Sequence, residues 1–235
     1  MTRLYQKDER LFSLVWIGLY VLGLSMGHFL SPSPRADSPT RAIVCAAMAA
    51  ALVGWIVRNG LRGKYGLIGV RGDLQRFFYF LPLIVIASAN LWGGLAFNLP
   101  LSEALWGVVA LLCASVAEEI LFRGFLFRAL YTKHVPGAAI LSSAAFALMH
   151  ALNFFNGAPT LAILLQIGYA GAIGYLLAVL AKQSKSLIPG MIAHGVLNMT
   201  SLWAREPAMN VQLIMAGTVI CISLLYAQWL LRKYP

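Results

Sequence analysis

The sequence predicts an all-α fold, a bundle of about eight helices that span a membrane. Of its 235 residues, 60% are hydrophobic and only 11% are charged, and the mean hydropathy is +0.77. A soluble domain would carry about 25% charged residues. The apolar residues also gather in runs long enough to cross a bilayer as helices. These observations indicate an integral membrane protein.

Eight apolar runs have about the 20 residues that a transmembrane helix needs. The first run is long for a signal peptide, and no small-residue cleavage site follows it cleanly, so we expect a retained helix. The expected spans are Leu11–Leu30, Arg41–Val57, Phe78–Leu99, Glu103–Leu130, Pro136–Phe155, Thr160–Ala181, Leu187–Trp203 and Val211–Leu231.

The basic residues predict how these helices are oriented, because Lys and Arg gather in the cytoplasmic segments of membrane proteins. With eight crossings and the N-terminus inside, 15 of the 18 Lys and Arg residues fall inside, and only Arg35, Arg41 and Arg205 fall outside. We therefore expect both termini in the cytoplasm. The same rule explains the net charge of +10, so no nucleic-acid partner is expected. The basic segment 58–76 is read as a cytoplasmic loop in preference to a lipid-head-group site.

Two adjacent carboxylates and an arginine interrupt the fourth run, in the stretch EEILFR at 118–123. A charge at the centre of a membrane helix is disfavoured by ~2.5–3.5 kcal/mol on insertion scales, so these residues need partners. Glu119 and Arg123 are four positions apart on one helix face and are expected to form an ion pair. Glu118 points about 100° away and is expected to remain unpaired.

Two further polar pairs interrupt later runs. Phe146 and His150 are one helical turn apart, and so are His194 and Asn198. Taken alone, each pair is also compatible with a purely structural hydrogen bond between helices. Three single polar residues are expected to form such structural hydrogen bonds: Asn90, Asn153 and Gln166.

These clusters are expected to converge. The spans 103–130 and 136–155 form an antiparallel hairpin, which places Glu118 and His150 at equal distances from its centre and at similar depth. His194 and Asn198 follow Ser186 closely enough to lie on the order of 12–18 Å deep at 1.5 Å per residue. One site inside the bundle, toward the cytoplasmic face, is predicted. The segment 153–159 should line a cavity or be buried, since irregular backbone is tolerated in a membrane only there.

The expected site carries the groups that amide hydrolysis needs. Glu118 is a candidate general base for an attacking water, and His150 would hold that water or carry its proton. His194 and Asn198 are candidate hydrogen-bond donors to the oxyanion. Three neighbours are expected to support the site: Glu119, Arg123 and Phe146.

A metal site would use the same side chains. Glu118, His150 and His194 could bind zinc and leave one position open for water. No H-E-x-x-H motif is present, and ligands from three helices form a pattern that spacing does not test. Glutamate chemistry without a cofactor is therefore preferred, and zinc is the alternative. The three cysteines lie in separate apolar runs without a C-x-x-C pair, so neither a disulfide framework nor a thiolate zinc site is expected.

Three motifs occur in order: E-E-x-x-x-R as EEILFR at 118–123, F-x-x-x-H as FALMH at 146–150, and H-x-x-x-N as HGVLN at 194–198. In this pattern the chain resembles the CPBP family of intramembrane proteases. That family contains the type II CAAX prenyl endopeptidases and bacterial relatives linked to bacteriocin processing and self-immunity. The resemblance implies a conical helical bundle with a cytosol-facing cavity. It divides one integral membrane domain into variable helices over 1–102, with the basic loop near 58–76, a catalytic core over 103–203 and a C-terminal helix over 204–235.

The resemblance also implies roles for the motif residues. Glu118 would act as base together with His150, and His194 and Asn198 would form the oxyanion hole. The family was long described as metalloproteases, so the zinc alternative stays open. The implied activity is cleavage of a membrane-embedded or lipidated protein or peptide near the cytoplasmic face. So compact a chain resembles the bacterial branch, which implies a bacterial plasma membrane. Nothing in the sequence indicates a prenylated substrate.

Two other functional classes stay open. A membrane interaction or bacteriocin self-immunity protein could keep the same fold without proteolysis. An ion-coupled transporter would use intramembrane Glu and His as a relay. The sequence shows neither the internal repeat nor the matched broken helices that many transporters have, which makes that class the least favoured.

Overall fold

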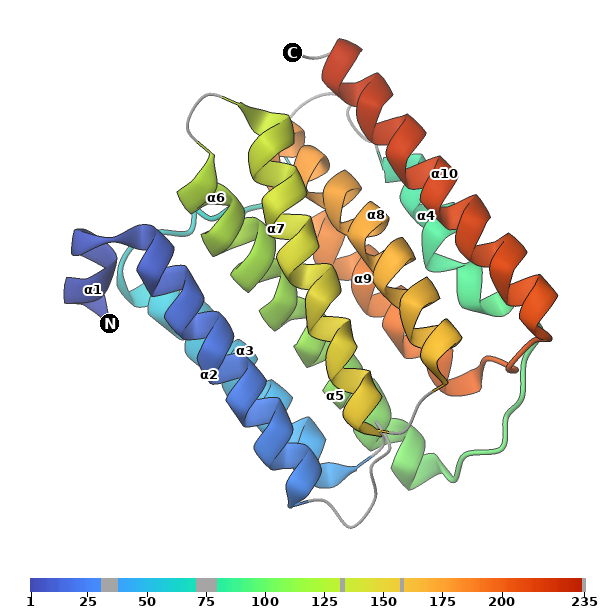
Figure 1. Cartoon of the computed structure of the whole chain (residues 1–235). Helices are drawn as coiled ribbons and strands as arrows, with labels where there is room; N and C mark the ends of the chain where they lie inside the picture. Colours follow the sequence, from blue (N-terminus) through green and yellow to red (C-terminus); the bar gives the residue numbers. More distant parts are fainter. Residues whose placement is uncertain (31–37, 71–79, 132–133, 157–158, 234–235) are drawn as a thin grey trace.

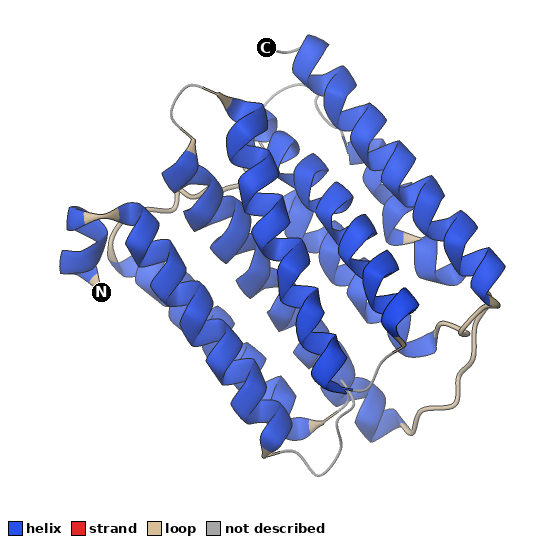
Figure 2. Cartoon of the chain, viewed as in Figure 1, coloured by secondary structure: helices blue, strands red, loops and turns tan. Residues whose placement is uncertain are grey.

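The computed structural model describes residues 1–30, 38–70, 80–131, 134–156 and 159–233. Over these ranges the chain is a helical bundle without strands, apart from one isolated bridge between Leu95 and Ala204 (Figure 2). The helices are α1 Thr2–Lys7, α2 Glu9–Phe29, α3 Pro39–Arg58, α4 Leu81–Ala87, α5 Leu101–Glu118, α6 Phe127–Leu130, α7 Val135–Met149, α8 Thr160–Ser184, α9 Ile188–Thr200 and α10 Met209–Lys233. A π-helical segment, η3, covers Glu119–Leu126, and shorter 3₁₀ turns are η2 Ala89–Leu91, η4 His150–Asn156 and η5 Ser201–Trp203.

Local signals set where the long helices begin. The Asp8 carboxylate accepts hydrogen bonds from the first backbone N–H groups of α2, and the Ser38 hydroxyl does the same for α3. The His134 ring caps α7 by accepting from Gly137 N. Such caps satisfy backbone donors that no carbonyl of the helix can reach. A single residue with positive φ, Lys185, ends α8 and turns the chain into α9.

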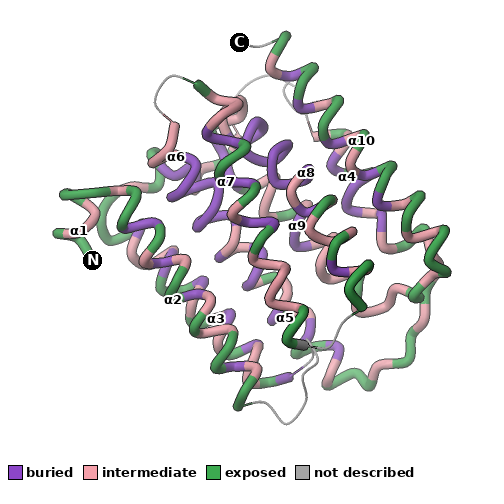
Figure 3. Tube along the Cα trace, in the orientation of Figure 1, coloured by how far each residue is buried: buried purple, intermediate pink, exposed green. Residues whose placement is uncertain are grey.

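The bundle is built around α8. Its residues from Ala170 to Ala181 are almost all buried, which fits a helix that is apolar on every side (Figure 3). α7 and α10 pack on α8, while the continuous helix α5–η3–α6, Leu101–Leu130, packs against α3 and α9 (Figure 1). α2 lies beside α3 at one side of the bundle, and α4 lies beside α10 at the other.

The outer helices carry the lipid-facing surface. Large apolar side chains such as Leu22, Ile43 and Leu225 are each more than half exposed on α2, α3 and α10. A soluble protein rarely exposes contiguous apolar patches of this kind. Six helices are long and apolar enough to cross a membrane within the described residues. The chain is therefore an integral membrane protein.

The prediction of eight full-length spans is not confirmed. Six of the eight expected runs form long helices: Glu9–Phe29, Pro39–Arg58, Leu101–Leu130, Val135–Phe155, Thr160–Ser184 and Met209–Lys233. The expected span 78–99 holds only the short α4 and η2, and its first two residues lie outside the described part of the chain. The expected span 187–203 holds α9 and η5. These two short segments pack together, and Asn90 Nδ2 donates to the Leu197 carbonyl between them.

Both termini lie at the same end of the bundle (Figure 1). The basic segment after α3 folds back onto this end. Lys64 pairs with Glu9 and donates a hydrogen bond to the Tyr5 hydroxyl, and the Gly66 carbonyl accepts from Leu187 N at 2.8 Å. The rest of the predicted basic loop, 71–76, lies outside the described residues.

Candidate active site

The two adjacent glutamates stand where the α-helix α5 passes into the π-helical segment η3. Glu118 is the last residue of α5 and Glu119 is the first residue of η3. Insertions of π-helix in an α-helix occur frequently at functional sites. The two carboxylates diverge from this junction, as expected for neighbours on a helix. Glu118 borders a large cavity, whereas Glu119 borders a separate narrow pocket.

Glu119 forms the predicted ion pair with Arg123. The Glu119 Oε1 atom lies 3.1 Å from Arg123 Nη1, and both side chains are no more than 1% exposed. The Arg123 guanidinium also stacks over the Phe146 ring, 4.1 Å from its centroid. A Cβ added at Gly174 would come within 2.7 Å of Arg123 Nη2, so this glycine makes room for the guanidinium. The buried arginine is thus held by charge, by an aromatic face and by shape.

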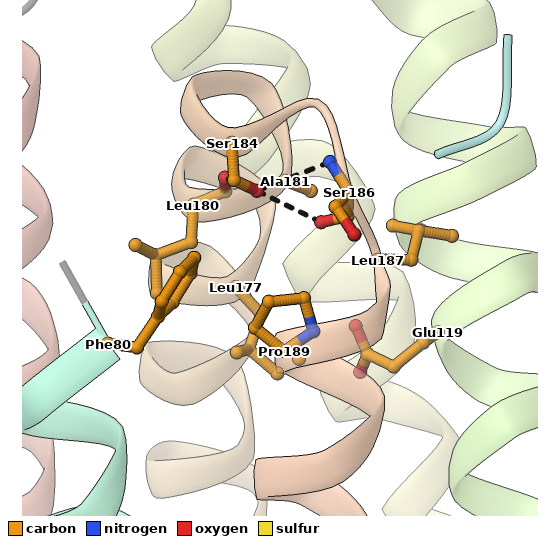
Figure 4. Close-up of a pocket in the computed structure, with 10 residues that line it drawn as sticks. Phe80, Glu119, Leu177, Leu180, Ala181, Ser184, Ser186, Leu187 and Pro189 are labelled. Atoms are coloured by element: carbon orange, nitrogen blue, oxygen red, sulfur yellow. Dashed lines mark hydrogen bonds between the residues drawn. The ribbon is translucent and has the colours of Figure 1, made fainter. Parts of the chain in front are cut away.

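The narrow pocket beside Glu119 lies between α8 and the start of α9. Figure 4 shows the Glu119 side chain directed toward Pro189, below the turn that the Ser184 hydroxyl braces by hydrogen bonds to the backbone of Ser186. A Cβ at Gly190 would lie 3.4 Å from Glu119 Oε2. α9 therefore approaches the carboxylate with backbone, without an intervening side chain at this position.

His194 lies between the two glutamates. Its Nδ1 atom is 3.0 Å from Glu119 Oε1, and its Nε2 atom is 3.5 Å from Glu118 Oε2. Because an ionised carboxylate only accepts hydrogen bonds, Nδ1 carries the proton that faces Glu119. The 3.5 Å separation at Nε2 exceeds an ordinary N–H···O hydrogen bond. That ring edge faces Glu118 and the cavity.

His150 is oriented by its own helix. Its Nδ1 atom lies 3.2 Å from the Phe146 carbonyl, and its ring packs edge-on against the Phe146 ring at 5.0 Å. When Nδ1 donates to that carbonyl, Nε2 becomes the acceptor of a neutral imidazole. Phe146 also packs edge-on against His194 at 5.6 Å, so one aromatic ring positions both histidines.

Asn198 already has a partner. Its Nδ2 atom donates to the Ser115 hydroxyl at 3.0 Å, across the contact between α9 and α5. An amide NH₂ has two donor hydrogens, so one donor remains for a further acceptor. The contact with Ser115 fixes the Asn198 side chain. The remaining amide hydrogen is the one that the predicted role as oxyanion donor would use.

Glu118, His150, His194 and Asn198 all line one cavity of about 590 Å³. Ligand pockets typically measure about 300–1,000 Å³. No hydrogen bond joins Glu118 to His150 in the described part of the chain, so proton transfer between them would pass through a water or a substrate group. The turn η4 contributes to the cavity wall, as expected for irregular backbone at membrane depth. The other predicted polar contact is also present, since Asn153 Nδ2 donates to Gln166 Oε1 at 2.8 Å.

Residues 100–200 match the family model described as type II CAAX prenyl endopeptidase Rce1-like. This segment is similar to Rce1-like domains, and we call it the Rce1-like segment. The match contains all three motifs and confirms the resemblance to CAAX proteases. No curated protein and no solved structure matches the chain.

A residue outside the Rce1-like segment also reaches the site. The Tyr20 hydroxyl, on α2, donates a hydrogen bond of 2.9 Å to Glu118 Oε1, and the Tyr20 side chain is fully buried. The prediction that Glu118 is unpaired is therefore wrong. The sequence offered one indication of this contact. Tyr20 lies in an apolar helix, and a tyrosine hydroxyl that is buried there needs a polar partner.

The described residues contain no cluster of side chains that would support the zinc alternative. Among the described residues, no group of three or more His, Cys, Asp or Glu side chains is close enough together to hold a metal ion. Glu118, His150 and His194 border the same cavity but do not form such a group.

The cavity extends from Glu118 and His194 toward the end of the bundle where α2 ends and α3 begins. Its deep wall is formed by Glu118 and His194, and its rim by the highly exposed Phe29 and Phe155. The rim belongs to the end of α2 and to η4, which lie opposite the two termini (Figure 1). The cytosol-facing cavity that the resemblance implies stays a prediction.

Proposed function

We propose that this chain is an intramembrane endopeptidase that hydrolyses a peptide bond with a water activated by Glu118. The supporting observation is the gathering of Glu118, His150, His194 and Asn198 around one cavity within an apolar bundle. The match to the Rce1-like family supports the reaction class. The proposed substrate is a membrane-embedded or lipidated protein or peptide.

Glu118 is the base in this proposal. It accepts a proton from the water while the water oxygen bonds to the carbonyl carbon of the scissile peptide. The hydrogen bond from Tyr20 occupies Oε1, which leaves Oε2 to receive the proton. His150 Nε2 would orient the same water or carry its proton onward. General acid–base catalysis of this kind contributes about 10²–10⁴-fold to a rate.

The oxyanion that forms on the carbonyl oxygen needs donors. The second amide hydrogen of Asn198 is one donor. The Nε2–H of His194 is the other when the ring carries a proton on both nitrogens, since Nδ1 already donates to Glu119. Both residues lie on one face of α9 and border the same cavity. Donors fixed in place before the reaction stabilise developing charge at little reorganisation cost. The intermediate then collapses as the C–N bond breaks, and the proton taken by Glu118 passes to the leaving nitrogen.

Glu119 and Arg123 act as supports in the proposal. Their ion pair holds the η3 backbone and gives His194 Nδ1 a fixed acceptor. This contact sets the imidazole tautomer, so Nε2 is the ring atom presented to the reaction. Phe146 limits the rotation of both histidines.

Cleavage in reconstituted proteoliposomes tests the proposal. The purified chain and its Glu118→Gln variant would be incubated with a panel of membrane-anchored and lipidated peptides, with a chelator in half of the samples. We expect cleavage that Glu118→Gln abolishes and the chelator does not. Cleavage that is lost on chelation and restored by zinc would assign these residues to a metal. If the panel stays intact, the non-proteolytic interaction or immunity role gains weight.

A further inference from the structure

Residues 61–68 follow α3, outside the Rce1-like segment, and approach the start of α9 backbone to backbone. The Gly66 carbonyl accepts a hydrogen bond of 2.8 Å from Leu187 N. Gly66 has φ +67°, and a Cβ added there would lie 3.1 Å from Leu187 N and 3.2 Å from the Lys185 carbonyl oxygen. Glycine therefore suits this position twice, for its left-handed backbone and for the close approach of another backbone.

A serine hydroxyl adds a second contact at the same turn. Ser186 Oγ donates a hydrogen bond of 2.6 Å to the Ile68 carbonyl and accepts one of 3.2 Å from Ile188 N. The backbone donors at the start of a helix have no carbonyl partner within that helix. Leu187 N and Ile188 N are both satisfied here, the first by segment 61–68 directly and the second by a hydroxyl that this segment holds.

Segment 61–68 has anchors of its own on the other helices. Tyr65 is 1% exposed, and its ring packs edge-on against Phe125 of η3 with the ring centroids 4.8 Å apart. The neighbouring Lys64 forms an ion pair with Glu9, at the start of α2. The segment therefore joins α2, η3 and α9 at one end of the bundle.

The place where α9 begins decides where two site residues stand. Leu187 lies between segment 61–68 and η3, since a Cβ added at Gly124 would be 3.3 Å from Leu187 Cδ1. His194 and Asn198 follow Leu187 by about two and three helical turns. A displacement at the start of so short a helix is carried along its backbone to both side chains.

We infer that segment 61–68 is a positioning element for the candidate active site. It fixes the start of α9, and through α9 it fixes His194 and Asn198 relative to Glu118. Residues 61–68, all of which the structure describes, are not part of the large cavity's wall, so the segment acts only through the helix. Its effect on cleavage rests on the proposed function, whereas its hold on α9 depends on the fold alone.

Gly66→Ala tests the inference, with Gly60→Ala as the matched control. Both glycines have left-handed backbone, with φ +67° and +69°, so alanine is strained at both. A Cβ at Gly60 meets open space, whereas a Cβ at Gly66 meets the backbone before α9. The full-length variants would be compared by hydrogen exchange of the α9 amides in detergent and by peptide cleavage in proteoliposomes.

We expect the α9 amides of Gly66→Ala to exchange faster than those of Gly60→Ala, because a helix that loses its anchors opens locally more often. A misplacement of about 1 Å can cost 10²-fold in rate, so kcat should fall by on the order of 10–100-fold in Gly66→Ala, with KM within about twofold of the parent. Gly60→Ala should keep the parental kcat.

Ser186→Ala is a second variant that leaves the glycine backbone intact. It removes only the hydroxyl between Ile68 and α9, and both changes are expected in the same direction but smaller than in Gly66→Ala. Its control is Ser13→Ala, because the buried Ser13 hydroxyl bonds to the Glu9 carbonyl within its own helix. If Gly66→Ala does not fold, the comparison of these two serine variants decides.

The inference is overturned if each variant matches its control in both α9 exchange and kcat. Faster exchange in α9 with an unchanged kcat would also overturn it, because the segment would then stabilise the helix without positioning the site. If the parent chain cleaves no peptide, the proposed function fails, and the exchange measurement still decides whether segment 61–68 holds α9.

Discussion

The Tyr20 hydroxyl donates a hydrogen bond of 2.9 Å to Glu118 across 98 positions of sequence. This contact ties α2, outside the Rce1-like segment, to the proposed base. It occupies one carboxylate oxygen and fixes the plane of the carboxylate, so the other oxygen has a defined direction. The N-terminal helices therefore complete the site as well as surrounding it.

Replacing Tyr20 by phenylalanine should slow peptide cleavage while the chain still folds. A hydrogen bond to a charged group contributes about 1.5–3 kcal/mol, and each ~1.4 kcal/mol is tenfold in rate. We expect kcat to fall by on the order of 10–100-fold. Tyr169→Phe is the matched control, because Tyr169 lines the same cavity and is not bonded to Glu118. Equal losses in the two variants would show that the effect is not specific to the Glu118 contact.

Removing one partner of the Glu119–Arg123 ion pair should destabilise the fold more than replacing both partners together. Leaving one buried charge without its partner destabilises a protein by about 3–5 kcal/mol, whereas an apolar replacement of both is often tolerated. Arg123→Met alone should lower the unfolding temperature in detergent strongly, and adding Glu119→Leu should recover part of that loss. A double variant with the summed loss of both single variants would argue against coupling between them.

Gly174 should tolerate no side chain. The Cβ of Gly174→Ala would meet Arg123 Nη2 at 2.7 Å and the Phe146 and Ser143 side chains at 3.3 Å. Overpacking of this kind costs about 1–3 kcal/mol, and a lower unfolding temperature is expected. Gly217→Ala in α10 is the control, because open space surrounds that position and alanine favours a helix. Equal unfolding temperatures for the two variants would mean that the space at Gly174 is not needed.

Variants of Asn198 and of its partner Ser115 should distinguish hydrogen-bond donation to the oxyanion from positioning of the Asn198 amide. Asn198→Asp removes both amide donors and should lower kcat by on the order of 10²–10³-fold, as loss of an oxyanion donor does. Ser115→Ala keeps the amide and removes only its anchor, so a loss of no more than about tenfold is expected. Measured kcat values that fall equally in both variants would reduce Asn198 to a structural contact between α5 and α9.

Local spacing predicted the parts of this site that depend on one helix or one hairpin. The four-residue separation of Glu119 and Arg123 was enough to predict their ion pair, which the structure contains. The hairpin symmetry of residues 118 and 150 placed both on one cavity. The interhelical hydrogen bonds of Asn90 and Asn153 also followed from the cost of a lone polar group among apolar helices.

Other features depend on packing between distant segments, which spacing does not encode. Tyr20 carries no motif, and its partner is fixed only when α2 packs beside η3. The expected span 78–99 has sufficient hydropathy, yet helix α4 ends at Ala87. Depth counted along α9 located His194 within the membrane. It did not show that α2, through Ser25 and His28, forms part of the cavity wall.

The most direct test of the account compares Glu118→Gln with Glu103→Gln in the cleavage assay. Both changes remove one carboxylate from the same helix, but Glu103 lies in the first turn of α5, away from the site. The account predicts that Glu118→Gln lowers kcat by at least 10²-fold, the lower end of general base catalysis, while Glu103→Gln stays within about twofold of the parent. Cleavage by Glu118→Gln at the parental rate would contradict the assignment of Glu118 as the base.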